Sequence, residues 1–232
     1  MAEPELKFRL IGDWHPVLLP QVETRDLIAA YVNGLVGRRD EDANARALLT
    51  RELRAVTDSA AQGEVTAMFL MTALTGVPMP VALTVISRSD LRMAPAFGTA
   101  PQKVIEILHE SFRQLSRPGV EDAVVLSIPE AEVLRLHTTT EVDVEFSEEE
   151  RAAADPTVLA EVDQLRNRAL TAEYWYTVPG TKNVLLVNLS TPMADIPHIM
   201  LDFFDSIIKA SYFEMPETAA EDESGAEADE TD

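Results

Sequence analysis

The stretch TAEYWYTVPGTKNVLLVNLSTPMADIPHIMLDFFDSIIKASY, residues 171–212, decides the fold of this 232-residue chain. Two runs rich in aromatic and β-branched residues, 171–178 and 183–189, lie on either side of the turn sequence PGTK at 179–182. Apolar runs separated by a short turn that contains Pro and Gly are typical of two antiparallel strands. We therefore predict a β-hairpin.

A long amphipathic helix is predicted after this hairpin. Asp195 is the expected N-cap, and Pro197 suits the first turn of a helix. Apolar side chains recur at helical spacing on one face, which comprises Ile196, Ile199, Met200, Phe203, Phe204, Ile207, Ile208 and Tyr212. The opposite face is expected to meet solvent and carries His198, Asp202, Asp205, Ser206 and Lys209. An apolar face of this size predicts that the helix packs firmly on a sheet.

Paired strands and helices alternate through the rest of the chain. In chain order we predict two short strands within 6–19, helices over 24–37 and 41–62, a hairpin of 65–74 with 80–87, a helix over 101–116, strands at 122–128 and 133–146, and a helical stretch from 147 to about 168. Hairpins build antiparallel pairs, and no strand–helix–strand unit carries a phosphate-binding glycine turn. The expected fold class is α+β, with an antiparallel meandering sheet sandwiched by helices as α/β/α. Residues 1–213 are expected to form one domain.

The strand expected at 133–146 has the clearest period-two pattern in the chain. Its even positions hold apolar residues and threonines, and most of its odd positions are polar, so one face is expected to pack and the other to meet solvent. The polar face carries Arg135, His137, Glu141, Asp143 and Glu145. Carboxylates there could ligate Mg²⁺ or Ca²⁺, but the loop and glycine turn of a dedicated calcium site are missing. A solvated face or a docking strip for a basic partner is favoured, and no metal ion is assigned.

Acidic residues dominate the charge, with 40 Asp and Glu against 19 Lys and Arg and a formal net charge of -21. This balance argues against nucleic acid and anionic lipid as partners, because both require a basic face. The segment 214–232 holds nine acids and no basic residue, which predicts a disordered tail. Such a tail solubilises the protein or docks on a basic partner, and the first role is favoured. The absence of Cys excludes disulfides, thiol catalysis and Cys-ligated metals.

The uncharged run 65–87 is long enough to span a bilayer. Gly76, Pro78 and Pro80 interrupt its middle, so a buried hairpin is favoured over a membrane span. The first ten residues, MAEPELKFRL, lack the basic and apolar regions of a secretory signal. We expect a cytoplasmic protein without membrane insertion. Only 4 of the 19 basic residues are Lys, a composition typical of a high-GC bacterial gene.

The sequence contains no recognisable catalytic motif. The nucleophile elbow G-x-S-x-G is missing, and the GTK at 180–182 lacks the upstream glycine of a P-loop. Partner-binding residues are expected instead on an edge strand beside Pro16, at the one basic doublet, in the long loop 89–101 and on the polar face of strand 133–146. These candidates are Trp14, His15, Arg38, Arg39, Met93, Phe97, Arg135, His137, Glu141 and Asp143. No cofactor is expected.

The C-terminal unit resembles the closing unit of the Mog1/PsbP-like superfamily. The matching pieces are the strand VLLVNL at 184–189, the turn STP at 190–192 and the helical segment 203–211. An N-terminal hairpin that contains Phe and Trp, and a sheet between helices, also look similar. The resemblance implies a helix–sheet–helix sandwich. It also implies a binding or assembly role, because the members are mostly adaptors for a small GTPase, photosystem accessory subunits and bacterial lipoproteins. It implies no catalytic residue.

Two functions follow from these observations. The first is a non-catalytic adaptor or assembly protein of a high-GC bacterium, which binds a protein partner through a sheet edge, an acidic face and loop 89–101. A basic protein is one candidate for that partner. The alternative is a small-molecule-binding or divalent-metal-dependent enzyme, in which His137, Glu141 and Asp143 serve as acids, base or ligands.

Overall fold

The computed structural model describes residues 4–17, 25–37, 65–88, 98–141 and 168–215, together with positions 46, 49–51, 53, 54 and 91. Most of the predicted helix 41–62, of loop 89–101, of the stretch 147–168 and of tail 214–232 lies outside these residues. No helix in the described part of the chain is long and apolar enough to cross a membrane.

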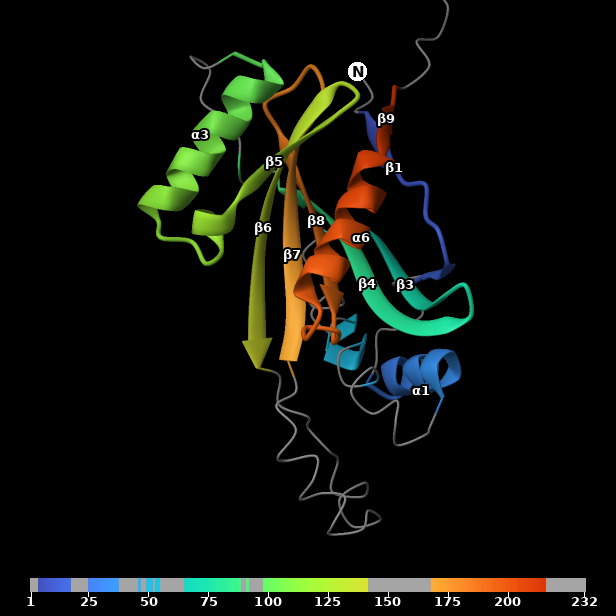
Figure 1. The fold of residues 1–232 in the computed structure, drawn as a ribbon. Coiled ribbons are helices and arrows are strands. Elements are labelled where there is room, and N and C mark those ends of the chain that lie inside the picture. The colour runs from blue at the N-terminus through green and yellow to red at the C-terminus, as the bar shows by residue number, and fades with distance from the viewer. Residues whose placement is uncertain are drawn as a thin grey trace, which may run out of the picture.

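Strands and helices alternate along the described chain (Figure 1). The strands are β1 (Glu5–Lys7), β2 (Asp13–Pro16), β3 (Val65–Leu74), β4 (Val77–Arg88), β5 (Val124–Ile128), β6 (Ala131–Glu141), β7 (Arg168–Thr177), β8 (Val184–Thr191) and β9 (Tyr212–Glu214). The helices are α1 (Arg25–Val36), α3 (Pro101–Gln114), the short 3₁₀ helix η4 (Val120–Asp122) and α6 (Pro197–Lys209).

Seven of the strands form one antiparallel sheet in the order β2-β3-β4-β8-β7-β6-β5. Two meanders build it, β2 to β4 and β5 to β8, and they join where β8 pairs with β4. The uncharged run 65–87 is the β3–β4 hairpin, and the PGTK turn connects β7 to β8. The α+β class and the meandering antiparallel sheet are confirmed.

Helix α6 covers one face of this sheet (Figure 1). Met200, Phe204 and Ile208 of α6 join inward side chains of β3 to β8 in the largest apolar core of the described residues. Tyr174 and Tyr176 of β7 are fully buried beneath the helix. Burial of a large aromatic or aliphatic side chain contributes about 1.5–3 kcal/mol, so this core is the main source of stability on this face.

Two further helices cover the opposite face. Ile28 and Val32 of α1 pack on β3 around Leu70. Helix α3 packs on β6, β7 and β8 around Trp175, whose ring meets Phe112 edge-on with centroids 5.0 Å apart. Helices therefore lie on both faces, and the predicted α/β/α sandwich is confirmed.

The predicted N-terminal hairpin is wrong. Strand β1 pairs with β9 in a separate two-stranded sheet, with Leu6 opposite Phe213, whereas β2 pairs with β3. Between the two strands, Gly12 has a φ of +111° and lies against the carbonyl oxygen of Ala73, where the chain joins the edge of the large sheet.

Three details of the last helix are also wrong. Ile196 is the N-cap residue, and no side chain caps the helix at that position, so Asp195 does not have its predicted role. Ile199 is 52% exposed, although it was expected on the buried face. Asp205 was expected in solvent and is buried against the sheet.

The prediction of a solvated polar face on the strand at 133–146 is wrong for Arg135. Residues of this face in β6 lie beneath α6, and the side chain of Arg135 is only 12% exposed. Glu141 is exposed at the end of β6, where no described helix covers it. A helix packed on that face therefore determines which polar positions reach solvent.

Candidate functional site

The structure does not bring the candidate partner-binding residues together. Arg38, Arg39, Met93, Phe97 and Asp143 lie outside the described residues. Trp14 and His15 lie on β2, whereas Arg135, His137 and Glu141 lie on β6, with four strands between them in the sheet. These two groups therefore belong to different surfaces.

Trp14 and His15 are already engaged within the fold. The indole Nε1 of Trp14 donates to the carbonyl oxygen of Ile11 at 3.0 Å. A hydrogen bond of 3.4 Å joins His15 Nε2 to the hydroxyl of Thr72. Both side chains are half-buried, so this edge presents little free apolar surface.

Arg135 takes part in a buried polar network below α6. Its Nη1 lies 2.6 Å from Oδ2 of Asp205, and the hydroxyl of Tyr174 donates to Oδ1 of the same carboxylate at 2.8 Å. Burial raises the pKa of Tyr174 well above its usual value, and the negative charge of Asp205 raises it further. The network fixes α6 to the sheet.

His137 and Glu141 do not form a metal centre with other described residues. No three His, Asp or Glu side chains within the described ranges lie close enough to share a metal ion. His137 Nδ1 is buried and has no hydrogen-bond partner among the described residues. On this face of β6 the structure shows an ion pair of Arg135 with Asp205.

The two edges of the large sheet differ in how far they are protected against strand addition. Strand β2 carries an irregular register between Asp13 and Trp14 and ends at Pro16. A bulge, a charge and a proline are features that block pairing with another strand. At the other edge, β5 pairs regularly with β6, and its sequence VVLSI contains no charge and no proline.

The outer edge of β5 is open within the described part of the chain, because the sheet ends there. Val124 is 37% exposed and Val125 is 50% exposed, while Leu126 and Ile128 are buried in the core. The buried side chains of Leu126 and Ile128 thus fix the strand to the core, while Val124 and Val125 present apolar surface to solvent. An uncharged, regular edge of this kind is a template for another strand.

Acidic side chains flank β5 at both ends. Glu121 and Asp122 are exposed on η4 immediately before the strand, and Glu130 is exposed in the turn immediately after it. The uncharged edge is therefore enclosed between negative charges. Charges placed next to an apolar contact surface select partners of the opposite sign.

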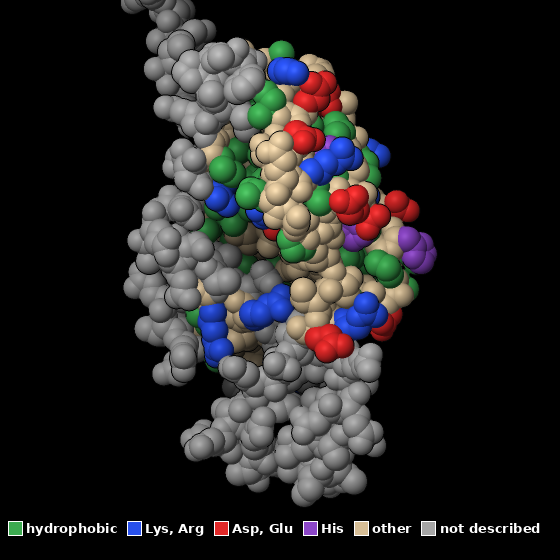
Figure 2. Space-filling view, turned by 90° about the vertical axis from the view of Figure 1, so that its left-hand side faces the viewer, with side chains coloured by type: hydrophobic (Ala, Val, Ile, Leu, Met, Phe, Trp, Pro, Cys, Tyr) green, Lys and Arg blue, Asp and Glu red, His purple; other side chains and the backbone are tan. Residues whose placement is uncertain are grey.

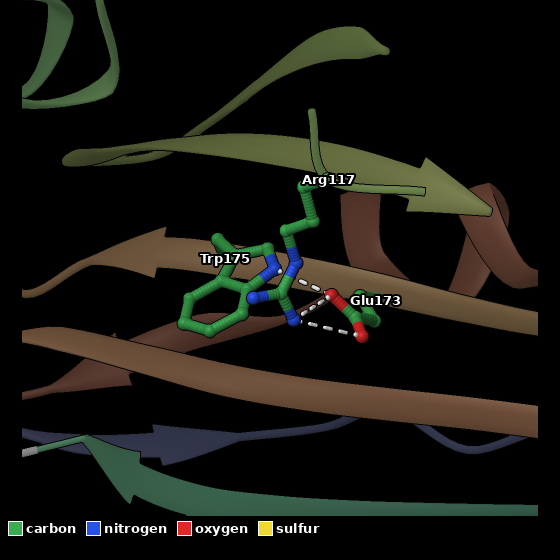
Figure 3. Close-up of polar contacts among 3 residues, drawn as sticks. All are labelled: Arg117, Glu173 and Trp175. Carbon is green, nitrogen blue, oxygen red and sulfur yellow. Dashed lines mark hydrogen bonds and ion pairs between the residues drawn. The ribbon is translucent and has the colours of Figure 1, made fainter. Parts of the chain in front are cut away.

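A charged cluster holds the segment that leads into β5 (Figure 3). Arg117 Nη2 donates to both carboxylate oxygens of Glu173, at 3.1 and 2.8 Å, and the indole Nε1 of Trp175 donates to the same carboxylate at 3.0 Å. The guanidinium also lies over the rings of Phe112 and Trp175, 4.8 and 5.0 Å from their centroids. The loop after α3 is therefore tied to the sheet.

Gly119 and Val120 hold the acidic residues Glu121 and Asp122 in place before β5. Gly119 has a φ of +80°, and a Cβ atom at this position would lie 2.3 Å from the carbonyl oxygen of His137. Val120 is buried beside the α3 core. Glu121 and Asp122 follow directly, so their position relative to β5 is set by packed neighbours on β6 and β7.

Charge on the face around α3 is mixed (Figure 2). The figure shows acidic and basic side chains interspersed over this side of the molecule, without one large acidic surface. Lys103 and Glu106 of α3 pair with each other at 3.0 Å. The acids beside β5 are thus a local feature and not part of a uniform acidic face.

Sequence reasoning predicted β5 as a strand but missed its position at the edge. Periodicity identifies strands and does not give their order in a sheet. The available signal was the uncharged VVLSI at 124–128 between Glu121-Asp122 and Glu130. Arg117 and Glu173 were also missed, because they are 56 positions apart in the chain.

Comparison with known proteins identifies no family for this chain. No family model matches the chain, and no curated protein matches it by sequence. The resemblance to the Mog1/PsbP-like superfamily therefore stays a prediction. The crystal structure of LpqN, which is involved in cell envelope biogenesis of Mycobacterium tuberculosis, is similar with a TM-score of 0.41 and 10% sequence identity. The similarity covers 91% of this chain and 84% of the LpqN chain.

Proposed function

We propose that this protein is a non-catalytic adaptor or assembly protein that binds an extended segment of a protein partner along the outer edge of β5. The observation that carries the proposal is the exposed, uncharged edge Val124–Ile128 with acidic side chains at both of its ends. A strand added to such an edge gains main-chain hydrogen bonds, and its side chains determine specificity. The bound segment thus becomes an eighth strand of the sheet.

The flanking charges define the chemistry of the partner. A segment that fits has about five residues of apolar and β-branched character, with Lys or Arg on both sides. These basic residues lie opposite Glu121 and Asp122 at one end and Glu130 at the other. The expected partner is therefore basic and binds the folded body of the protein at this edge.

A second copy of this chain fits this edge poorly. Antiparallel pairing of two β5 strands centred on Leu126 places Asp122 of each copy opposite Glu130 of the other. Like charges directly opposite one another are destabilising. The net charge of -21 adds a general repulsion between copies.

Peptide selection tests this function. A phage-displayed library of random dodecamers is selected on the full chain and counter-selected on the Val125→Lys variant. We expect the enriched peptides to show an alternating apolar core between basic residues. A charge on the edge strand blocks pairing, so Val125→Lys should weaken binding of these peptides by about tenfold or more.

The opposite edge of the sheet provides the matched control. His15→Lys places the same charge on β2 and should leave peptide affinity unchanged. Equal affinity of the selected peptides for wild type and Val125→Lys would contradict the proposal, as would enrichment of peptides with acidic flanks.

A further inference from the structure

A cavity of about 690 Å³ lies on the α6 side of the sheet, away from β5. The N-terminal segment from Pro4 to Leu10 forms one wall, and strands β3, β4 and β8 form the other. Strand β9 closes one side through Tyr212 and Phe213. Binding sites for small molecules in proteins typically have volumes of about 300–1,000 Å³, so this space is large enough for a ligand.

The cavity exists because two different elements cover this face of the sheet. Helix α6 packs over β5 and β7, whereas β1 and the chain after it run beside β3 (Figure 1). An extended segment is thinner than a helix and fills less of the space above a sheet. Phe69 on β3 and Leu185 on β8 consequently remain only partly buried, although both belong to the inward-facing side of the sheet.

The lining combines apolar and polar side chains, and its two charged residues have opposite signs. Its apolar residues include Leu6, Phe8 and Phe213 from the two ends of the chain and Phe69, Val85 and Leu185 from the large sheet. The two charged residues of the lining, Glu5 and Lys7, pair with each other at 2.7 Å. Ser87 and Asn183 supply uncharged polar groups.

These features determine the class of ligand. The apolar part of the lining favours an apolar body. Lys7, the cation of the lining, already pairs with the carboxylates of Glu5 and Glu214, so an anionic head would leave water without an uncompensated charge to meet it. We propose that the cavity binds an uncharged amphiphile, with a hydrocarbon body along Phe69 and Leu185 and a hydroxyl-bearing end near Ser87 and Asn183. This site is separate from the proposed function, because β7 and β6 lie between β8 and the edge strand β5.

Binding of a neutral fluorescent probe tests the site. The probe is N-phenyl-1-naphthylamine, added to the full chain, and its fluorescence should rise to saturation as it enters the cavity. 1-Dodecanol should displace it, and dodecanoate at pH 8 should require about tenfold more ligand, because its carboxylate is desolvated while Lys7 is already paired with Glu5 and Glu214. The absence of saturable binding, or equal displacement by the two compounds, would overturn the proposal.

Substitutions locate the probe. Ala67→Phe places a ring inside the cavity and should weaken probe binding by about tenfold, with circular dichroism confirming the fold. Ser87→Trp blocks the rim from a half-buried position and provides a second, independent variant. Leu115→Ala removes an exposed apolar side chain elsewhere and should leave binding unchanged. Probe affinity equal to wild type in both cavity variants would exclude this site.

Discussion

Arg135 and Asp205 form an ion pair between β6 and α6, with Nη1 2.6 Å from Oδ2 and both side chains 12% exposed. Tyr174 donates to the second oxygen of the carboxylate. Both charged residues occupy positions whose sequence pattern predicts solvent exposure. The pair therefore joins the polar side of a strand to the polar side of a helix, and it sets how α6 lies on the sheet.

Removal of Asp205 should destabilise the protein strongly. Asp205→Ala leaves Arg135 buried without a counter-charge, and we expect the free energy of unfolding to fall by about 3–5 kcal/mol. Chemical denaturation at pH 7 measures this loss. The triple variant Arg135→Met, Tyr174→Phe and Asp205→Leu should recover most of it, because neither a buried charge nor an unpaired Tyr174 hydroxyl remains.

A neighbouring exposed residue serves as the control for this prediction. Asp202→Ala on the solvent side of α6 should change the stability by no more than about 0.5 kcal/mol. A loss below about 1 kcal/mol in Asp205→Ala would show that the ion pair does not hold the helix.

Stability should fall at alkaline pH because of two buried tyrosines. Burial raises the pKa values of Tyr174 and Tyr176 above the ordinary value of 10.0. The unfolded chain loses these two phenol protons near pH 10, whereas the folded chain retains them. The tyrosines therefore contribute fully to the free energy of unfolding below pH 10, and this contribution is lost as the pH rises toward the folded pKa. Each tyrosine should lower the free energy of unfolding by about 1.4 kcal/mol per pH unit in that interval.

Denaturation curves at several pH values between 9 and 11.5 check this dependence. Tyr176→Phe removes one titrating group and should flatten the decline, although its lost hydrogen bond with Ser211 lowers the stability at all pH values. An unchanged slope in this variant would contradict the assignment.

Gly119 should tolerate no side chain. Gly119→Ala strains a positive φ and forces a Cβ atom against the backbone of His137. Gly180 has a similar φ of +69° but open space around its Cα, so Gly180→Ala reports the backbone strain alone. We expect a loss of about 1–2 kcal/mol for Gly180→Ala and a clearly larger loss for Gly119→Ala. Equal losses, measured by urea denaturation, would show that the contact with β6 is unimportant.

Arg117 should affect partner binding more than stability. Its side chain is 33% exposed and that of Glu173 is 30% exposed, so solvent weakens their pairing. Arg117→Ala should therefore cost only about 1 kcal/mol of stability. The acidic flank on η4 loses its anchor in this variant, and the affinity of β5-directed peptides should drop severalfold. If Arg117→Ala lowers the stability but leaves the peptide affinity unchanged, the Arg117–Glu173 cluster has no role in binding at the edge of β5.

The period of the hydrophobic pattern predicted most elements of the fold. The apolar runs beside Gly/Pro turns at 65–74 and 171–178 identify strands, and the helical repeat at 196–208 identifies a helix that buries one face. The pattern fails where an element is covered on both faces. Arg135 and Asp205 look like solvent-facing residues, yet each neutralises the other inside the interface.

The candidate site was less predictable because it depends on strand order. Pro16 correctly indicates that β2 is an edge, but local sequence does not show that β5 is the other one. The pairing of β1 with β9 joins residues more than 200 positions apart, and no local signal encodes it. The cavity beside this pair could not be predicted for the same reason.

Hydrogen–deuterium exchange of the full chain, with and without a selected peptide, measures strand addition directly. If the partner pairs with β5, amides within 124–128 should exchange more slowly in the complex, because the outward-pointing ones gain hydrogen bonds. Amides of β2 at the opposite edge should be unaffected. Protection at β2 instead, or binding without any slowing at 124–128, would contradict the proposal that β5 is the docking edge.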